Sequence, residues 1–455
     1  MIAPARQAAF GALVAIARGR VDLDAAVDRA RDAVSDPRDV ALVRELVTGT
    51  LRWQTRLDWQ LAPLCRVAWR KIDLEVQTVL RLAAFQLLEL DRLPPSAVVH
   101  DAVALVRQAR KSSASGLVNA VLRRLAAGER APWPLADQAA ALAVTAAHPA
   151  WLVARWLSRR PRADVEAWLA FDNAVAPTML RVNPLGGLTR EAAAVALAAD
   201  GVATSPCRFA PLGLVVTAGV AWQSAPVRDG RLFIQDEGSQ LAALVAPVRP
   251  GHRVLDVCAA PGGKTLAYAA AAGAGGRVVA CDVRLRRVQT HAATVAAAGA
   301  RGVDVVAIDP DAALPFSATF DVVAVDAPCS GLGTLRRDPD IKWRRAPDDL
   351  RTFQARQLDL LDRASRCVAA GGALVYTTCS TEPEENVEVV ARWLEAHPDF
   401  ARVAADAGPN GATLRPFLSA EGDFVTDPVR DGLEGYFGAV LVRGPRGRVP
   451  GAVVQ

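Results

Sequence analysis

The chain has 455 residues, about half of them hydrophobic and 22% charged, which predicts a globular protein with roughly two to four domains. No apolar run approaches the roughly 18 residues that cross a bilayer, which argues against a membrane-spanning protein. Seven cysteines form no CxxC pair, which argues against a disulfide framework or a zinc site. We therefore expect a cytoplasmic protein with reduced thiols and no metal, and we take a monomer as the default.

The net charge of +5 is unevenly distributed. Residues 1–130 carry 20 Lys and Arg against 14 Asp and Glu, a net charge of +6, whereas the remainder carries 33 against 34. An excess of positive charge in one region favours an acidic partner such as RNA, although a moderately basic face is often an ordinary solvated surface.

Residues 1–130 are predicted to form an all-α domain. Stretches such as DVALVRELVTGTLRWQTRLDWQL and EVQTVLRLAAFQLLEL repeat apolar residues at intervals of three and four, which is the spacing of an amphipathic helix. The segment LPPS separates two of these helices and offers Ser96 as an N-cap. A Pro/Trp-rich segment, APWPLADQ, then indicates a linker.

Residues 131–240 are predicted to hold a helical linker followed by a small α+β RNA-binding insert. The helical part covers about 136–171, and TMLRVNP, GLVVT and GRLFIQ indicate short strands. From 241 to 445 the pattern changes to strands that alternate with helices: RVLDV, GRVVACD, VDVVAID, FDVVAVD and ALVYTT. This alternation predicts an α/β, Rossmann-like, doubly wound parallel sheet with helices on both faces.

Ligands of such a sheet bind at the carboxyl ends of the strands, so the residues that follow each strand are the candidate site. A small glycine-bearing turn follows RVLDV and opens a helix, where a ligand can approach the backbone closely. Asp282 ends the second strand, 26 residues after Asp256, where a carboxylate can bind the hydroxyls of a ribose. Asp309 and Asp326 end the next two strands. The candidate cofactor-binding residues are Cys258, Ala259, Ala260, Pro261, Gly262, Gly263, Lys264, Asp282, Asp309 and Asp326.

Two kinds of nucleoside site fit this pattern. GGKT after a strand, together with VVAVD, is close to the motifs of a P-loop NTPase. However, that loop requires glycine where this chain has Cys258, and Pro261 removes a backbone N–H that the loop would use to bind phosphate. A cofactor with an adenosine and a ribose but no triphosphate needs only the close approach and Asp282. This favours S-adenosylmethionine.

Three segments, DVCAAPGGKT, DAPCSGLGTLRRDPDIKW and YTTCSTEPEEN, resemble the RNA 5-methylcytosine methyltransferases. The helical N-terminus, with VTGTLRW and NAVLRR, resembles the NusB-like domain of the RsmB (Sun) branch of that family. The resemblance implies an S-adenosylmethionine-dependent rRNA (cytosine-C5)-methyltransferase. Its implied partner is RNA, as 16S ribosomal RNA or a small-subunit assembly intermediate. The resemblance also implies that Cys379 attacks the base, that Cys329 acts in release, and that Lys264 belongs to the active site.

The chemistry explains why these residue types are needed. Carbon 5 of cytosine is a poor nucleophile until a thiol adds at carbon 6, and cysteine is partly ionised at neutral pH. Addition is easier when a carboxylic acid binds ring nitrogen 3, and Asp326 follows a strand at the right edge for this role. The predicted catalytic residues are therefore Cys379, Cys329, Asp326 and Lys264.

A basic run lies beyond Cys329. The run TLRRDPDIKWRR places Arg and Lys around Trp343, a mixture suited to single-stranded or flipped-out RNA, although it is also compatible with a solvated loop. Two alternative functions stay open at this point. One is a P-loop-like NTPase, which predicts magnesium-dependent ATP binding, and the other is a non-enzymatic NusB-type RNA-binding module, which requires neither cysteine.

Overall fold

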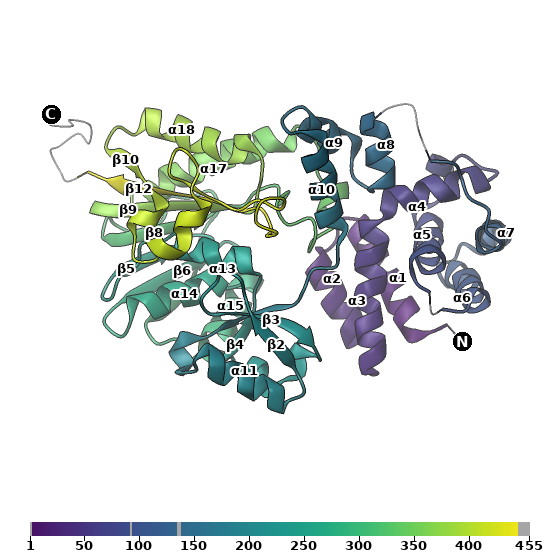
Figure 1. Cartoon of the computed structure of the whole chain (residues 1–455), viewed down its shortest axis with the longest axis horizontal. Helices are drawn as coiled ribbons and strands as arrows, with labels where there is room; N and C mark the ends of the chain where they lie inside the picture. Colours follow the sequence, from purple (N-terminus) through teal and green to yellow (C-terminus); the bar gives the residue numbers. More distant parts are fainter. Residues whose placement is uncertain (1, 92, 134–137, 445–455) are drawn as a thin grey trace. The chain divides into compact units, whose positions relative to one another are not determined.

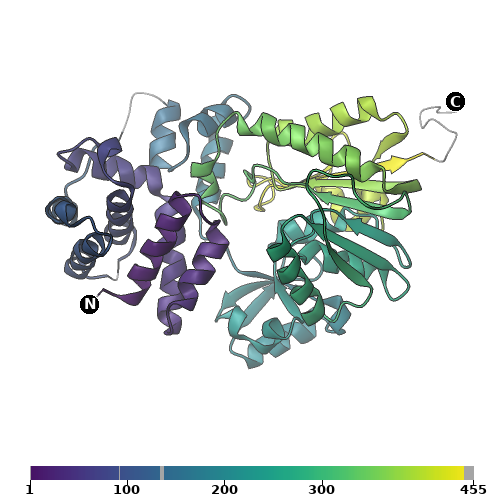
Figure 2. The same ribbon diagram turned by 180° about the vertical axis from the view of Figure 1, so that it is seen from behind.

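The structure, a computed structural model, describes residues 2–91, 93–133 and 138–444. It divides into two compact units, one made of Met1–Val175 with Leu335–Pro347 and the other of Ala176–Thr334 with Asp348–Gln455. Figures 1 and 2 show the helical first unit in purple and blue and the second unit in teal, green and yellow. Among the described residues, no helix is long and apolar enough to span a membrane.

The first unit is helical, as predicted. Helices α2 and α3 of this unit begin with a side-chain cap, in which the Asp22 carboxylate accepts a hydrogen bond from the Ala25 N–H and the Asp36 carboxylate one from the Arg38 N–H. The Ser96 N-cap is wrong, because Pro95 already occupies the first helical turn and Pro94 is the cap residue. The helical segments are α1 (Pro4–Ala17), α2 (Leu23–Asp32), α3 (Pro37–Arg52), α4 (Gln54–Leu61), η1 (Ala62–Leu64), η2 (Trp69–Lys71), α5 (Leu74–Glu89), α6 (Pro95–Gln108), η3 (Ser112–Ala114), α7 (Ser115–Ala126), α8 (Gln138–Thr145), α9 (Ala150–Leu157), α10 (Arg162–Asn173) and α16 (Ile341–Arg344).

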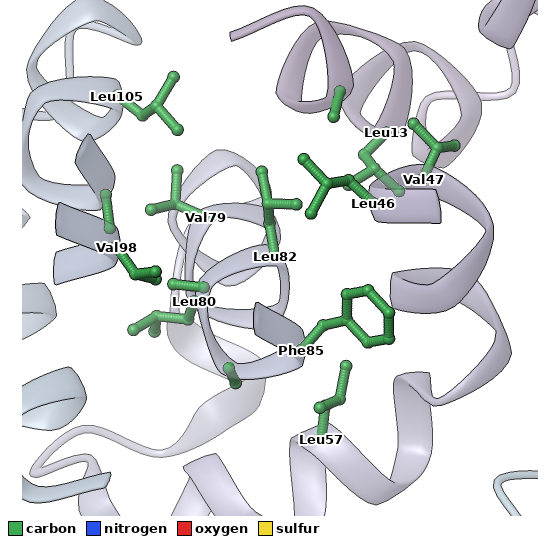
Figure 3. Packing of buried hydrophobic residues seen from close by; sticks show 14 of the residues in the cluster. Leu13, Leu46, Val47, Leu57, Val79, Leu80, Leu82, Phe85, Val98 and Leu105 are labelled. Carbon is green, nitrogen blue, oxygen red and sulfur yellow. The ribbon is translucent and has the colours of Figure 1, made fainter. Parts of the chain in front are cut away.

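Helix α5 lies at the centre of the first unit. Val79, Leu80, Leu82 and Phe85 of α5 are buried on different sides of the helix, and Figure 3 shows them between the side chains of α1, α3, α4 and α6. Gly49 of α3 permits this packing, because a Cβ atom there would lie 2.0 Å from the Phe85 ring. The glycine of the VTGTLRW motif therefore has a packing role.

The second unit begins with a small antiparallel sheet of strand order β2-β3-β1-β4. Its core joins Leu180 and Val182 of β1 to Leu197 of α11 and Leu214 of β3. The elements are β1 (Met179–Val182), η4 (Pro184–Gly186), α11 (Arg190–Ala199), β2 (Ala203–Pro206), β3 (Gly213–Ala218), η5 (Ala221–Gln223), α12 (Ala225–Arg228) and β4 (Leu232–Ile234).

The large sheet has the order β10-β12-β9-β8-β5-β6-β7, with β11 paired to β12. Its elements are α13 (Glu237–Leu244), β5 (Arg253–Asp256), α14 (Gly263–Ala272), β6 (Arg277–Asp282), α15 (Leu285–Ala297), β7 (Val303–Ala307), β8 (Phe320–Asp326), α17 (Asp349–Ser365), β9 (Val368–Thr378), η6 (Pro383–Glu385), α18 (Val387–Ala396), β10 (Phe400–Val403), η7 (Ala405–Ala407), α19 (Gly411–Leu414), η8 (Arg415–Phe417), β11 (Phe424–Val425) and β12 (Phe437–Arg443).

Helices cover both faces of this sheet. Val322 and Ala324 of β8 belong to the core beneath α13 and α14, whereas Val323 and Val325 belong to the core beneath α17 and α18. Figure 1 shows these two layers of helices on opposite sides of the strands. Because both faces are buried, the strands are continuous apolar runs and do not alternate with polar residues.

The prediction of a parallel sheet is correct for five strands and incomplete for the whole. Strands β5 to β9 pair in parallel, but β12 pairs antiparallel with β9, and β10 and β11 pair antiparallel with β12. Gly371 and Gly372, which precede the predicted strand ALVYTT, lie inside β9. Gly371 has a φ of +78°, next to a register shift between β8 and β9, as in a β-bulge.

Residues 131–240 are divided between the two compact units, with α8 to α10 in the first and the small sheet in the second. We retain three domains, 1–130, 131–240 and 241–445, as a proposal based on the sequence.

Candidate active site

Four neighbouring strands bring the predicted residues to one edge of the large sheet. Strands β5, β6 and β8 end at Asp256, Asp282 and Asp326, and Cys379 directly follows β9. These strands are adjacent and parallel in the order β6-β5-β8-β9. Asp309 differs from the prediction, because β7 already ends at Ala307 and the Asp309 side chain is exposed, accepting a hydrogen bond from the Asp311 N–H at 2.8 Å.

The loop between β5 and α14 lies close to neighbouring segments. Gly262 has a φ of +112°, and a Cβ atom at this position would lie 2.5 Å from the ring of buried His291. Only glycine fits this conformation and this spacing without strain. Arg181 of β1 donates a hydrogen bond to the Gly263 carbonyl at 2.7 Å. The first residue of α14 is thus held by a strand of the small sheet.

Asp256 lies beneath this loop, and its side chain is 1% exposed. Thr265 Oγ1 donates to Asp256 Oδ2 at 2.7 Å, while Oδ1 has no hydrogen-bond partner among the described residues. Burial raises the pKa of Asp256 to about 7, and the Thr265 hydrogen bond partly offsets this effect. Burial, Asp256 and other nearby carboxylates also raise the pKa of the Cys258 thiol, which therefore stays protonated.

Asp282 is largely buried at the end of β6. Its Oδ1 accepts the Arg284 N–H at 3.1 Å, and its Oδ2 lies 3.4 Å from Arg287 Nη1. Arg287 also donates to the Ala260 carbonyl at 3.0 Å. Arg287 therefore links the second strand end to the glycine-bearing loop, a role that the sequence analysis missed.

Lys264 and Asp326 form an ion pair. Lys264 Nζ lies 2.7 Å from Asp326 Oδ2, and Thr377 Oγ1 donates to Asp326 Oδ1 at 2.9 Å. Burial alone would lower the pKa of Lys264, but Asp326 and, to a smaller extent, Cys379 outweigh it and raise the pKa. Lys264 is therefore a fixed positive charge beside the carboxylate. Its Nζ also lies 5.9 Å from the centre of the Tyr436 ring.

The two predicted cysteines face each other. Cys329 Sγ and Cys379 Sγ lie 3.3 Å apart, although 50 residues separate them in the chain. The hydrogen bond to Cys379, burial, and the charges of Cys379 and Glu385 all raise the pKa of Cys329. Either sulfur can donate the hydrogen bond that joins the two thiols.

Polar side chains behind the thiols were also missed. Buried Glu385 accepts hydrogen bonds from the serines that follow both cysteines, and Gln357 and Asn386 contact the same two segments. In the sequence, only the position of Glu385 and Asn386 within the motif segment TEPEEN could have pointed to them.

The expectation of RNA contact is wrong for two residues of the basic run. Segment 335–347 belongs to the first unit, where Lys342 is 1% exposed and donates to Asn173 Oδ1 at 2.8 Å. Trp343 packs against the helical core and donates through Nε1 to the Leu51 carbonyl at 2.7 Å. Burial lowers the pKa of Lys342 to about 7. Both side chains are therefore occupied within the protein.

The residues at the sheet edge fit an adenosyl cofactor. A glycine-bearing loop precedes the N-terminus of α14, and Asp282 lies at the end of the next strand, where it can accept hydrogen bonds from a ribose. The buried Asp256 Oδ1 lacks a partner among the described residues and is free to accept a further hydrogen bond. No group of three or more His, Cys, Asp or Glu that could hold a metal ion occurs in the described part of the chain.

Comparison with known families supports each part of this architecture. Residues 242–441 match the family described as 16S rRNA methyltransferase RsmB/F, residues 3–127 match the NusB family, and residues 148–223 match the ferredoxin-like domain of RsmF/B-like methyltransferases.

Relatives and solved structures cover most of the chain. Ribosomal RNA small subunit methyltransferase B of Pseudomonas putida is 34% identical over 96% of this chain and 98% of its own length. The probable ribosomal RNA small subunit methyltransferase B of Bacillus subtilis is 30% identical over 87% of this chain and 90% of its own length. The crystal structure of PH0851 has a TM-score of 0.83 at 24% identity, covering 97% of this chain and 99% of that one.

A methyltransferase homolog from Pyrococcus horikoshii has the same fold over 68% of this chain and 100% of its own, with a TM-score of 0.57 at 24% identity. These matches decide against the NTPase and the non-enzymatic module. The chain belongs to the RsmB/F family of S-adenosylmethionine-dependent rRNA methyltransferases.

Proposed function

We propose that the protein methylates carbon 5 of a cytosine in 16S ribosomal RNA through a covalent bond between Cys379 and the base. The observation that carries this proposal is the pair of thiols 3.3 Å apart beside the ion pair of Lys264 and Asp326. A single thiol would suffice for attack, whereas two facing thiols fit a reaction in which one adds to the base and the other removes a proton.

Cys379 is the attacking residue in this proposal. Its sulfur forms a bond to carbon 6 of the cytosine, and the electron pair of the C5–C6 double bond shifts into the ring, which makes carbon 5 nucleophilic. Cys379 is one cause of the raised pKa of Lys264, so the ammonium and the thiol are close enough to interact. Asp326 is one third exposed, and in this proposal it shares with ring nitrogen 3 the proton that the base takes up when the thiol adds.

Cys329 completes the reaction. S-adenosylmethionine, when bound, supplies an electrophilic methyl group to carbon 5. Once Cys379 is bonded to carbon 6, its hydrogen bond and its charge no longer raise the pKa of Cys329, so Cys329 loses its proton to solvent more readily. The Cys329 thiolate then takes the proton from carbon 5, the C5–C6 double bond re-forms, and the Cys379 thiolate leaves.

The cofactor in this proposal binds over the loop from Cys258 to Lys264 and the strand-end carboxylates. Asp282 would accept hydrogen bonds from the ribose, because it is the carboxylate that ends the second strand. Asp309, which is exposed beyond β7, would contact the adenine side, and Asp326 would lie at the methyl end.

RNA docking in this proposal involves the first unit. The net charge of +6 over residues 1–130 supports an acidic partner. A groove of about 570 Å³ between α6 and α7 is lined by His100, Arg107 and Arg123. The names of the relatives, which are small-subunit rRNA methyltransferases, support 16S rRNA as the substrate.

A trapping experiment tests this function. Wild type, Cys329→Ala, Cys379→Ala and a control, Cys65→Ala, are incubated with small-subunit rRNA and S-adenosylmethionine, and denaturant-resistant protein–RNA adducts are measured. We expect the adduct to accumulate in Cys329→Ala, which attacks but cannot release, and to be absent in Cys379→Ala. The opposite pattern would exchange the two roles, and normal RNA binding without adduct or methylated cytosine in any form would refute the proposal.

A further inference from the structure

A serine follows each cysteine, and both serines bind the same buried carboxylate. Glu385 Oε1 accepts the backbone N–H of Ser330 at 2.7 Å, and Oε2 accepts the hydroxyl of Ser380 at 2.6 Å and that of Ser330. The Glu385 side chain is 0% exposed. One carboxylate therefore joins the segments that carry Cys329 and Cys379.

Each segment also has an anchor of its own. Gln357 Nε2 donates to the Pro328 carbonyl at 3.0 Å and to Glu385 Oε1 at 3.2 Å. Asn386 Nδ2 donates to the Ser380 carbonyl at 2.8 Å. Gln357 thus holds the segment of Cys329 and Asn386 holds the segment of Cys379. Glu385 contacts both segments and connects them to each other.

The hydrogen bonds around Glu385 suit a carboxylate, and they partly offset the rise in its pKa that burial causes. The Ser330 N–H and the Gln357 amide can only donate, and the two serine hydroxyls complete a set that suits an acceptor-only carboxylate. We propose that Glu385 is a positioning residue that holds the thiols of Cys329 and Cys379 face to face through the serines that follow them. The catalytic meaning of this role rests on the proposed function.

The charge of Glu385 adds a second effect. The pKa of Cys329 is raised by the hydrogen bond to Cys379, by burial and by the charge of Cys379, and the charge of Glu385 raises it further. Glu385 thus favours the protonated form of Cys329 in addition to linking the two segments.

The test separates geometry from charge. Glu385→Gln keeps the shape and can still hydrogen-bond, since the serine hydroxyls can reorient, whereas Glu385→Ala removes the link. Glu388→Gln, on the exposed face of α18, is the matched control for loss of a nearby negative charge. The measurement is the rate at which dibromobimane cross-links Cys329 to Cys379, followed by peptide mass spectrometry, which requires no RNA and no methylation.

We expect cross-linking at the wild-type rate in Glu388→Gln and at that rate or faster in Glu385→Gln, because loss of the Glu385 charge favours the Cys329 thiolate. Cross-linking should be about tenfold slower in Glu385→Ala than in Glu385→Gln, because the segments lose their shared buried partner. If Glu385→Ala does not fold, the double variant Ser330→Ala/Ser380→Ala removes the same link and should show the same loss. Cross-linking at the wild-type rate in whichever of these variants folds would overturn the positioning role.

The charge effect has its own readout. In a Cys379→Ser background, Glu385→Gln should increase the rate of Cys329 alkylation at pH 8 several-fold, because removing the Glu385 charge lowers the pKa of Cys329 and leaves more of it as thiolate. An unchanged rate would overturn the charge effect. Wild-type protein that cross-links normally, together with a trapping experiment that yields neither adduct nor methylated cytosine in any variant, would refute the proposed function while leaving the geometric role of Glu385 to the cross-linking result.

Discussion

Asp256→Asn should stabilise the second unit above neutral pH. The folded protein raises the pKa of Asp256 from 3.8 to about 7, so between these values the folded state holds a proton that the unfolded state has lost. Unfolding then releases a proton, and the free energy of unfolding decreases as the pH rises through this window. Above pH 7 the folded state carries a buried charge at its full cost. Asn carries no charge at any pH and still accepts the Thr265 hydrogen bond.

The magnitude follows from the shift. One pKa unit corresponds to about 1.4 kcal/mol, so a shift of about three units gives about 4 kcal/mol at pH 8. Full conversion is justified because the side chain is 1% exposed. Relative to wild type, the free energy of unfolding of Asp256→Asn should therefore rise by about 2.3 kcal/mol from pH 5 to pH 7 and by about 0.4 kcal/mol more to pH 8, and stay level above that.

The assay is a urea titration at pH 5, 6, 7 and 8 without cofactor, read by pulsed hydrogen exchange of the peptides that contain β5 and β8. These strands belong to the core of the second unit, so their exchange reports its unfolding separately from the first unit. The control is Asp304→Asn, which removes a half-exposed carboxylate of β7 that pairs with Arg277.

The pH dependence of the stability difference between Asp256→Asn and wild type shows whether folding raises the pKa of Asp256. A difference in the free energy of unfolding that does not change with pH would mean that the Asp256 pKa is not raised. A variant that loses stability relative to wild type as the pH rises would mean that the carboxylate is stabilised in the folded state, the reverse of the argument.

Lys264→Met should slow alkylation of Cys379 at neutral pH about tenfold, because the thiolate loses a nearby cation; peptide mass spectrometry checks this, and an unchanged rate would argue that the ammonium does not act on Cys379. The double variant Arg107→Glu/Arg123→Glu should weaken RNA binding and reduce the salt dependence of the affinity, since both side chains line the groove between α6 and α7. Filter binding at several salt concentrations measures this, and an equal salt dependence in wild type and variant would show that the groove is not part of the RNA interface. Phe85→Ala should destabilise the first unit by about 3 to 5 kcal/mol, because it leaves a cavity at the centre of that unit. Pulsed hydrogen exchange of α5 peptides during urea unfolding measures this, and a loss below about 1 kcal/mol would contradict the central position of the ring.

The strand ends were predictable from the sequence. Apolar runs that end in Asp256, Asp282 and Asp326 are visible without coordinates, because strands buried on both faces have no polar positions until the chain emerges at the sheet edge. For the same reason Cys379 was predicted at the end of a strand, and β9 ends one residue before it.

Lys342 and Trp343 illustrate what composition conceals. A basic run with a tryptophan is typical of RNA-binding loops, yet Lys342 is buried and Trp343 is half-buried in the helical unit, where they donate to Asn173 and to the Leu51 carbonyl. Their acceptors lie more than 160 residues away in the chain. Local patterns contain no information about such partners.

The sequence by itself determined the all-α beginning, the five parallel strands and the acids and thiols at their ends, because these depend on periodicity and on short motifs. Only the tertiary structure decided that β12 extends the sheet, that the two sulfurs lie 3.3 Å apart, and that Glu385 joins the segments behind them. The distance between two thiols 50 residues apart is set by the pairing of β8 with β9 and by buried hydrogen bonds. Such contacts form only when the chain closes on itself.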